Sequence, residues 1–225
     1  MTTCPLFDLM VVQDLLSACD RNMRAQKVSI LRREFYNRKS TLVGRDLIGK
    51  ILVRTLEDGR RLEGIIVEAE AYGGSRDPAS HAFRGKTKRN KVMFGEPGHA
   101  YVYFTYGFHH CLNFVTSSEG VGASAVLIRA IEPTKGMEIS QKLRKKLEVE
   151  DLASGPGKLC QAFAIDLKLN GVDVAREDSP IFVRDQQVNG KVKTSPRIGI
   201  TTAISRRWRF YLEDNPCVSP RGRLI

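Results

Sequence analysis

A glutamate and a tyrosine two residues apart carry the clearest chemical signal in this sequence. Residues 62–71 are typical of a β-strand, and alternation along it places Glu68, Glu70 and Tyr72 on one face. A carboxylate beside an aromatic ring can activate a water next to a planar group stacked on that ring. A solvated strand face is the alternative, and the spacing alone favours it.

A tyrosine-rich segment, residues 98–113, is the second such feature. Its aromatic and β-branched side chains form two runs that favour strands, separated by a turn in which Gly107 can supply a positive φ. The predicted β-hairpin would expose Tyr106 and Phe108 at its tip, where turns normally carry small polar residues. Two explanations stay open: a corner packed under a loop, or a wedge that inserts between stacked bases.

Between these segments the chain is typical of a loop, and it carries a cluster of positive charge. The cations are Arg84, Lys86, Lys88, Arg89 and Lys91. Such a cluster is usually a solvated surface. Because this one lies near His81 and directly before the hairpin, contact with phosphates gains weight.

The composition points in the same direction. The 225 residues contain 36 Lys and Arg against 25 Asp and Glu, a net charge of +11, which favours nucleic acid as the partner and an anionic membrane surface second. No apolar run is long enough to cross a bilayer. The five cysteines and four histidines lack metal-ligand spacing, so we expect no metal or cofactor and a reducing, intracellular compartment.

The elements that position these residues follow no regular alternation of strand and helix. Further strands are predicted at 50–55, 123–131, 195–203 and 209–212, and helices at 40–48, 137–149 and 159–165, with 166–189 turn-rich. We expect Ser40-Thr41 to cap the first helix, and Arg129 to pair with a carboxylate or line a pocket. This pattern predicts one α+β domain with a mainly antiparallel sheet, residues 34–225.

Residues 1–33 differ from the rest of the chain. An amphipathic helix is possible near the start, but Asp8 and Asp14 speak weakly against a mitochondrial presequence. We expect a dispensable N-terminal extension.

The segment Ser154-Gly-Pro-Gly-Lys158 is not a phosphate-binding P-loop, since Leu159 stands where Ser or Thr should follow the lysine. It could still hold one phosphate weakly.

Several motifs occur together between about residue 34 and the C-terminus. They are V-E-A-E-A-Y (67–72), His81, K-R-N-K-V-M-F (88–94), P-G-H-A-Y-V-Y-F-T-Y-G (97–107), Asn113, L-I-R-A-I-E-P (127–133), G-P-G-K-L-C-Q-A (155–162) and the late P-R-I-G-I and R-F-Y-L segments. In this order they resemble the alkyladenine, or 3-methyladenine, DNA glycosylases.

The resemblance implies a fold, a reaction and roles for individual residues. It implies a curved antiparallel sheet with flanking helices and a protruding hairpin. It also implies a monofunctional, metal-free and monomeric enzyme of base-excision repair. The substrate would be duplex DNA carrying 3-methyladenine, 7-methylguanine, hypoxanthine or ethenoadenine, in the nucleus of a eukaryote or the cytoplasm of a bacterium. The implied roles are general base for Glu70, water holder for Arg129, walls around a flipped base for Tyr72, His81 and Tyr103, intercalation for Tyr106, exclusion of guanine for Asn113, and DNA contact for Phe108, His109, Lys88, Arg89 and Lys91.

Two departures and two rival functions accompany this resemblance. Phe108-His109 stands where members of the family carry Met-Tyr, and the stretch between His81 and Met93 is one residue shorter. A non-catalytic lesion- or RNA-binding module is one rival, but a pure binder gains nothing from a carboxylate facing a polyanion. A bifunctional lyase is the other, and it would need a lysine beside Glu70 or Tyr103.

Overall fold

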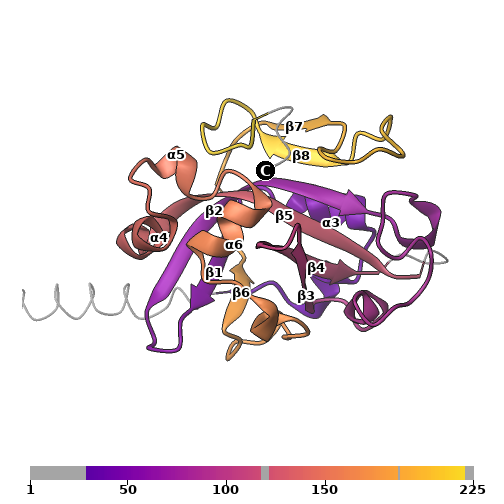
Figure 1. Cartoon of the computed structure of the whole chain (residues 1–225), viewed down its shortest axis with the longest axis horizontal. Helices are drawn as coiled ribbons and strands as arrows, with labels where there is room; N and C mark the ends of the chain where they lie inside the picture. Colours follow the sequence, from indigo (N-terminus) through magenta and orange to yellow (C-terminus); the bar gives the residue numbers. More distant parts are fainter. Residues whose placement is uncertain (1–28, 118–121, 187, 221–225) are drawn as a thin grey trace, which may run out of the picture.

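The computed structural model describes residues 29–117, 122–186 and 188–220, which form an α+β domain around one antiparallel sheet (Figure 1). The strand order is β3-β4-β5-β2-β1-β6, and β8 pairs with both β2 and β7. The strands are β1 (Ile51–Thr55), β2 (Arg61–Tyr72), β3 (Ala100–Thr105), β4 (His109–Thr116), β5 (Ser124–Lys135), β6 (Ile181–Arg184), β7 (Val192–Ser195) and β8 (Arg209–Leu212).

The sheet curls because β2 has two different partners along one edge. Its first residues pair with β1, and its segment 68–70 pairs with β8, while β5 runs along the other edge. The pairing of β2 with β5 shifts register on both sides of Glu68. Such irregularities bend a strand and increase its local twist, and here they carry Glu68 and Glu70 into the interior.

Short helices pack against this sheet and complete the core. They are α2 (Arg33–Tyr36), α3 (Ser40–Asp46), α4 (Met137–Arg144), α5 (Val149–Leu152) and α6 (Pro156–Ala162), with single 3-10 turns η1 (Gly74–Arg76), η2 (Lys91–Phe94) and η3 (Leu167–Leu169). Helix α3 packs on β2 and β5, and α6 packs on β4 and β5. Fully buried side chains such as Leu52, Ile66, Phe114 and Phe163 fill the space between them.

The strand pairing of both predicted hairpins is confirmed, whereas the protrusion of the second hairpin remains a prediction. Strands β1 and β2 pair across the Asp58-Gly59 turn, where Gly59 has φ 81°. Strands β3 and β4 pair from Ala100 with Phe114 to Thr105 with His109. The α+β class and the antiparallel sheet are also confirmed.

Several predicted boundaries are wrong for local reasons. Ser40 lies inside α3 and caps nothing, because the chain already turns helical at the residue after Lys39. The helix predicted over 137–149 ends at Arg144, where Lys145 adopts a left-handed conformation with φ 53°. Helix α6 starts at Pro156, since proline at the first helical position needs no N–H partner.

The C-terminal third differs most from expectation. The strand predicted over 195–203 is wrong: β7 ends at Ser195, and the following residues form a loop that borders the cavity described below. Strand β6 was missed, because its four residues lie within a segment rich in turn-forming residues. Edge pairing with β1 gives it its strand conformation.

The chain enters the fold upstream of Glu34. Leu31 donates its N–H to the Val183 carbonyl, and Ile30 forms a bridge with Arg184. Residues 1–28 lie outside the described part, so the expected extension remains a prediction. Within the described residues, none of the helices has the length and apolar content needed to cross a membrane.

Candidate functional site

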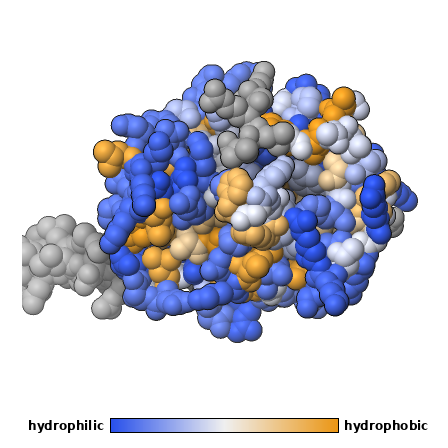
Figure 2. Space-filling model, viewed as in Figure 1, coloured by the Kyte–Doolittle hydropathy of each residue, from blue (hydrophilic) through white to orange (hydrophobic). Residues whose placement is uncertain are grey.

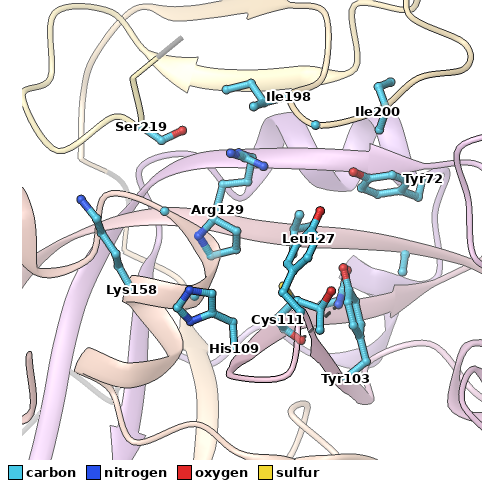
Figure 3. Close-up of a pocket in the computed structure, with 18 of the residues that line it drawn as sticks. Tyr72, Tyr103, His109, Cys111, Leu127, Arg129, Lys158, Ile198, Ile200 and Ser219 are labelled. Atoms are coloured by element: carbon cyan, nitrogen blue, oxygen red, sulfur yellow. Dashed lines mark hydrogen bonds between the residues drawn. The ribbon is translucent and has the colours of Figure 1, made fainter. Parts of the chain in front are cut away.

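A cavity of about 450 Å³ lies among the hairpin, β2, β5, the start of α6 and the loop 196–200 (Figure 3). That size is in the range of small-molecule sites. The lining residues include seven of the site residues singled out from the sequence: Tyr72, His81, Tyr103, Tyr106, His109, Asn113 and Arg129. These residues come from four separate segments, so the fold brings together what the sequence only suggested.

Aromatic rings form two sides of the cavity. Tyr72 projects from the end of β2 and Tyr103 from β3, with Leu127 of β5 between them in Figure 3. The His81 ring lies 4.6 Å from the Tyr103 ring, and its Nδ1 is 3.0 Å from the Tyr101 hydroxyl. Burial and the nearby Arg89 lower the pKa of His81, so at neutral pH this wall is an uncharged imidazole.

Glu70 lies directly behind the cavity surface. It is fully buried, and the three groups that contact its carboxylate all line the cavity. The Tyr72 hydroxyl donates to Oε2 at 2.9 Å, the Ile198 N–H donates to Oε1 at 2.7 Å, and Arg129 Nε lies 3.5 Å from Oε1. Burial raises the pKa of Glu70, opposed by Arg129 and by the Ile198 amide.

A second buried carboxylate, Glu68, was not assigned a role from the sequence. It accepts hydrogen bonds from Arg129 Nε at 3.0 Å and from Arg209 Nε at 2.6 Å. It also accepts from the Ser219 N–H and hydroxyl, both at 2.8 Å. The alternation of residues along β2 places Glu68 on the same strand face as Glu70, and this pattern could have identified Glu68 as a site residue from the sequence.

Arg129 connects the two carboxylates to the cavity. Its Nε is shared between Glu68 and Glu70, and its guanidinium points toward Ile198 and Ser219 in Figure 3. Burial opposes its charge, but the carboxylates raise the pKa of Arg129, so it stays a cation. Its terminal nitrogens have no hydrogen-bond partner among the described residues and are available to a cavity occupant. Both expectations for this arginine, pairing and pocket lining, are confirmed.

Asn113 lies on β4 opposite Tyr101 and lines the cavity while its side chain is fixed from behind. Its Nδ2 donates to the Tyr101 carbonyl at 3.0 Å and to the Cys111 carbonyl at 3.4 Å. The role that the resemblance implies for Asn113, exclusion of guanine, remains a prediction. The amide binds main chain and also forms part of the cavity surface.

The hairpin tip exposes large side chains beside the cavity. Tyr106 is 64% exposed and Phe108 60% exposed. Tyr106 has φ 53° and Gly107 has φ 78°, so a tyrosine occupies a conformation that few residues other than glycine adopt. His109 also lines the cavity, and its ring packs on the Phe108 ring and on Gly157 of α6.

The predicted phosphate-contacting cations lie outside the cavity. Lys88 and Lys91 are exposed and form no ion pair with any described carboxylate. Arg89 lies over the Tyr103 ring at 5.0 Å and donates to the Phe104 carbonyl, so it also braces the aromatic wall. The face shown in Figure 2 is mostly hydrophilic, with separate apolar patches.

Among the described residues, no group of three or more His, Cys, Asp or Glu side chains is arranged to hold a metal ion. The described cysteines, Cys111, Cys160 and Cys217, are buried free thiols. Lys158 lines the cavity beside His109 (Figure 3), where its ammonium lies 3.2 Å from the Ser154 hydroxyl and 3.5 Å from Asp151.

Comparison with known proteins identifies this arrangement with one family. A family model described as Methylpurine-DNA glycosylase matches residues 34–216. A protein of Methanocella arvoryzae named "Putative 3-methyladenine DNA glycosylase" is 50% identical over 197 residues, covering 86% of this chain and 97% of its own. Proteins with the same name from Carboxydothermus hydrogenoformans and Streptomyces avermitilis are 49% and 44% identical, covering 85% and 84% of this chain and 100% and 91% of their own.

Proposed function

Because the chain belongs to the methylpurine-DNA glycosylase family, we propose that it releases damaged purines from duplex DNA with a water activated by Glu70. The observation that carries the proposal is a buried carboxylate with a raised pKa, directly behind a cavity with aromatic walls. Titratable groups perturbed in this way concentrate at functional sites. We propose 3-methyladenine, 7-methylguanine, hypoxanthine and ethenoadenine as substrates.

Access to the base requires that the nucleotide leave the helix. A glycosidic bond inside a stacked duplex is out of reach, so the damaged nucleotide rotates into the cavity. There its base stacks between Tyr72 on one side and His81 and Tyr103 on the other. Electron-rich rings favour cationic N-methylpurines. Tyr106, exposed at the hairpin tip, occupies the gap left in the duplex.

Hydrolysis follows from the groups around Glu70. A water held where Arg129, Ile198 and Tyr72 meet would contact the carboxylate, since these are its cavity-lining neighbours. Glu70 takes a proton from this water as its oxygen bonds to the anomeric carbon and the glycosidic electron pair leaves with the base. A cationic N-methylpurine departs as a neutral molecule and needs no acid.

The charges behind the cavity suit this reaction. Two carboxylates, Glu68 and Glu70, stand against two guanidinium groups, Arg129 and Arg209. The cluster is therefore close to neutral and does not repel the positive charge that develops on the sugar. Anionic Glu70 faces that charge most closely, which favours the transition state. A non-catalytic binding module would gain nothing from burying this carboxylate.

The test is Glu70→Gln, measured by single-turnover excision from duplexes carrying one 7-methylguanine. The amide keeps the shape but cannot accept the proton, so we expect excision to fall by about 10²-fold or more while lesion binding persists. Glu63→Gln is the matched control, because Glu63 is a buried, ion-paired glutamate on the same strand that does not line the cavity. Near wild-type excision by Glu70→Gln would show that Glu70 is not the base.

A further inference from the structure

Asp77 and Arg197 form a fully buried ion pair behind the Tyr72 wall, outside the groups assigned to the reaction. Arg197 Nη1 donates to Asp77 Oδ2 at 2.5 Å, and Nη2 donates to Oδ1 at 2.8 Å, a bidentate arrangement. The Gly73 and Ala79 amides also donate to this carboxylate. Burial opposes the charge of Asp77, but these donors hold the pKa of its carboxyl below the ordinary value.

Arg197 makes two further contacts, both with the end of β2. Its Nη1 also donates to the carbonyl of Ala71, the residue between Glu70 and Tyr72, at 2.9 Å. Its guanidinium carbon lies 4.7 Å from the centre of the Tyr72 ring. Arg197 therefore holds the Tyr72 ring and the main chain of the preceding residue, Ala71, at the same time.

The residue after Arg197 contacts the general base directly. The Ile198 N–H donates to Glu70 Oε1 at 2.7 Å, and residues 198–200 line the cavity. On the other side of the pair, Asp77 lies in the loop that leads to His81. This ion pair therefore connects three segments: the loop that contains Ile198, the end of β2, and the loop that leads to His81.

We propose that Asp77 and Arg197 are positioning residues for excision, because their ion pair holds the Ile198 amide on Glu70 and the Tyr72 ring against the base. In this role the pair touches neither substrate nor water; it acts through these groups and through the charge of Arg197, which also interacts with Glu70. This inference rests on the proposed function, in which Glu70 is the general base. A buried pair of this kind is weak evidence of stabilisation, because desolvation of two charges offsets much of their attraction.

Loss of the pair should change the acidity of Glu70 in one direction. The Ile198 amide lowers the pKa of Glu70, so a loosened loop should move that pKa upward. The other charged or titratable groups facing Glu70 are Arg129 from β5, Glu68 and Tyr72 from β2, Cys111 from β4, and the Arg197 guanidinium itself. Arg197→Lys keeps a cation at position 197 and Asp77→Asn keeps the arginine, so both variants leave the charges in this set unchanged.

The experiment measures single-turnover excision of 7-methylguanine against pH for Arg197→Lys and Asp77→Asn. Because 7-methylguanine is cationic and leaves without an acid, the fall in rate at low pH, the acidic limb of the pH–rate profile, reports the titration of the general base alone. In the pH–rate profile, we expect each variant to lower the plateau rate at least several-fold. We also expect the midpoint of the acidic limb to move upward by about half a pH unit, the size of one weakened hydrogen bond. The double variant should resemble either single variant, since the two residues act as a unit.

Arg184→Lys is the control, because Arg184 pairs with Glu63 at 3.0 Å away from the cavity. A purely structural role would lower the thermal midpoint and leave the acidic limb in place, and that result would overturn the inference. If Arg197→Lys folds poorly, Asp77→Asn gives the same measurement with the arginine retained. Glu70→Gln separates the two proposals: full activity there refutes the proposed function, whereas an unmoved limb in the pair variants refutes only the positioning role.

Discussion

Glu70 shows how burial prepares one residue for its chemistry. Its carboxylate binds three partners, yet the cost of desolvation exceeds their combined effect, and the pKa is raised. A carboxylate with a raised pKa is a stronger base at neutral pH than one at the protein surface. The same burial disfavours the ionised form in the folded state.

The pH dependence of the wild-type enzyme follows from this shift. Excision of a cationic lesion requires ionised Glu70, so the rate should rise with pH through an acidic limb centred above the ordinary glutamate value of about 4.3. Single-turnover rates on 7-methylguanine between acid and neutral pH would give that midpoint. A midpoint at or below the ordinary value would contradict the burial argument.

Stability should show the opposite trend for the same residue. A group with a raised folded-state pKa contributes stability below its unfolded pKa, and this is lost as pH rises through the folded pKa. The free energy of unfolding of Glu70→Gln, relative to wild type, should therefore increase between mildly acidic and neutral pH. Urea unfolding at the two pH values measures this difference. A constant difference would indicate that the Glu70 charge is fully compensated.

Selectivity by exclusion at a single position is the role that we propose for Asn113. Two main-chain carbonyls hold its amide, so it cannot swing away from a base that fits poorly. Guanine differs from hypoxanthine by one exocyclic amino group, and we propose that this fixed amide crowds it. Asn113→Ser should shift discrimination toward guanine by roughly 1–3 kcal/mol. The ratio of single-turnover rates on guanine and hypoxanthine, each opposite the same base in the duplex, measures the shift. An unchanged ratio in a folded variant would show that Asn113 does not exclude guanine.

At the scale of elements, the hairpin of β3 and β4 combines exposure with backbone strain. Tyr106 is at once largely exposed and in a left-handed conformation. Strain of this kind costs on the order of 1–3 kcal/mol and concentrates at functional sites. Tyr106→Ser should weaken lesion-duplex binding by about 1–3 kcal/mol, the value of one stacking contact.

The fluorescence of a flipped ethenoadenine provides the measurement for this variant. We expect a lower flipped population for Tyr106→Ser and no change for Leu147→Ser, which removes an even more exposed apolar side chain beyond α4. An unchanged flipping equilibrium would mean that Tyr106 is only a surface residue of the turn.

Helix α6 approaches the base of the hairpin so closely that no side chain fits at Gly157 without a shift of His109. A Cβ added at Gly157 would lie 2.8 Å from the His109 ring, which is below normal contact distance. In an open helix, alanine in place of glycine would stabilise by up to about 1 kcal/mol. Here we expect Gly157→Ala to destabilise by roughly 1–3 kcal/mol, because the ring must move.

A double-mutant cycle tests whether the ring causes that cost. In a His109→Ala background the space is free, so Gly157→Ala should become neutral or stabilising in urea unfolding. Equal costs in the two backgrounds would assign the effect to the helix itself.

At the scale of the whole molecule, the net charge of +11 should dominate DNA affinity. Binding to undamaged duplex should fall steeply with salt, with a logarithmic slope near −0.9 for each phosphate neutralised. Lys88→Ala and Lys91→Ala should each reduce that slope by about one, because both ammonium groups lack an ion pair with any described carboxylate. A slope unchanged in both variants would place the phosphate contacts elsewhere on the surface.

We also predict that the enzyme as a whole needs no metal ion. Excision should proceed unchanged in excess EDTA, since the proposed reaction uses only Glu70 and its neighbours. Loss of activity in chelator, restored by a divalent cation, would overturn the mechanism.

Local signals in the sequence determined the two hairpins and the chemical types at the site. Turn residues such as Asp58-Gly59 and Gly107 act within a few positions, so they can be identified without tertiary context. The spacing of Glu70 and Tyr72 on one strand face likewise survives folding, because both residues lie on β2. Recognition of the ordered motifs then identified the family, and it suggested the roles that we propose for individual residues.

Tertiary structure alone decided which groups meet around those residues. Glu68 and Glu70 became interior because β2 bends where β5 and β8 both pair with it, and long-range pairing of this kind leaves no local pattern. Arg197 and Ile198 fall in a segment that propensity had predicted as a strand, yet they form a loop because Asp77 and Glu70 bind them there. Contacts between residues more than a hundred positions apart depend on how the chain packs, and so the contacts that support Glu70 were decided only by the fold.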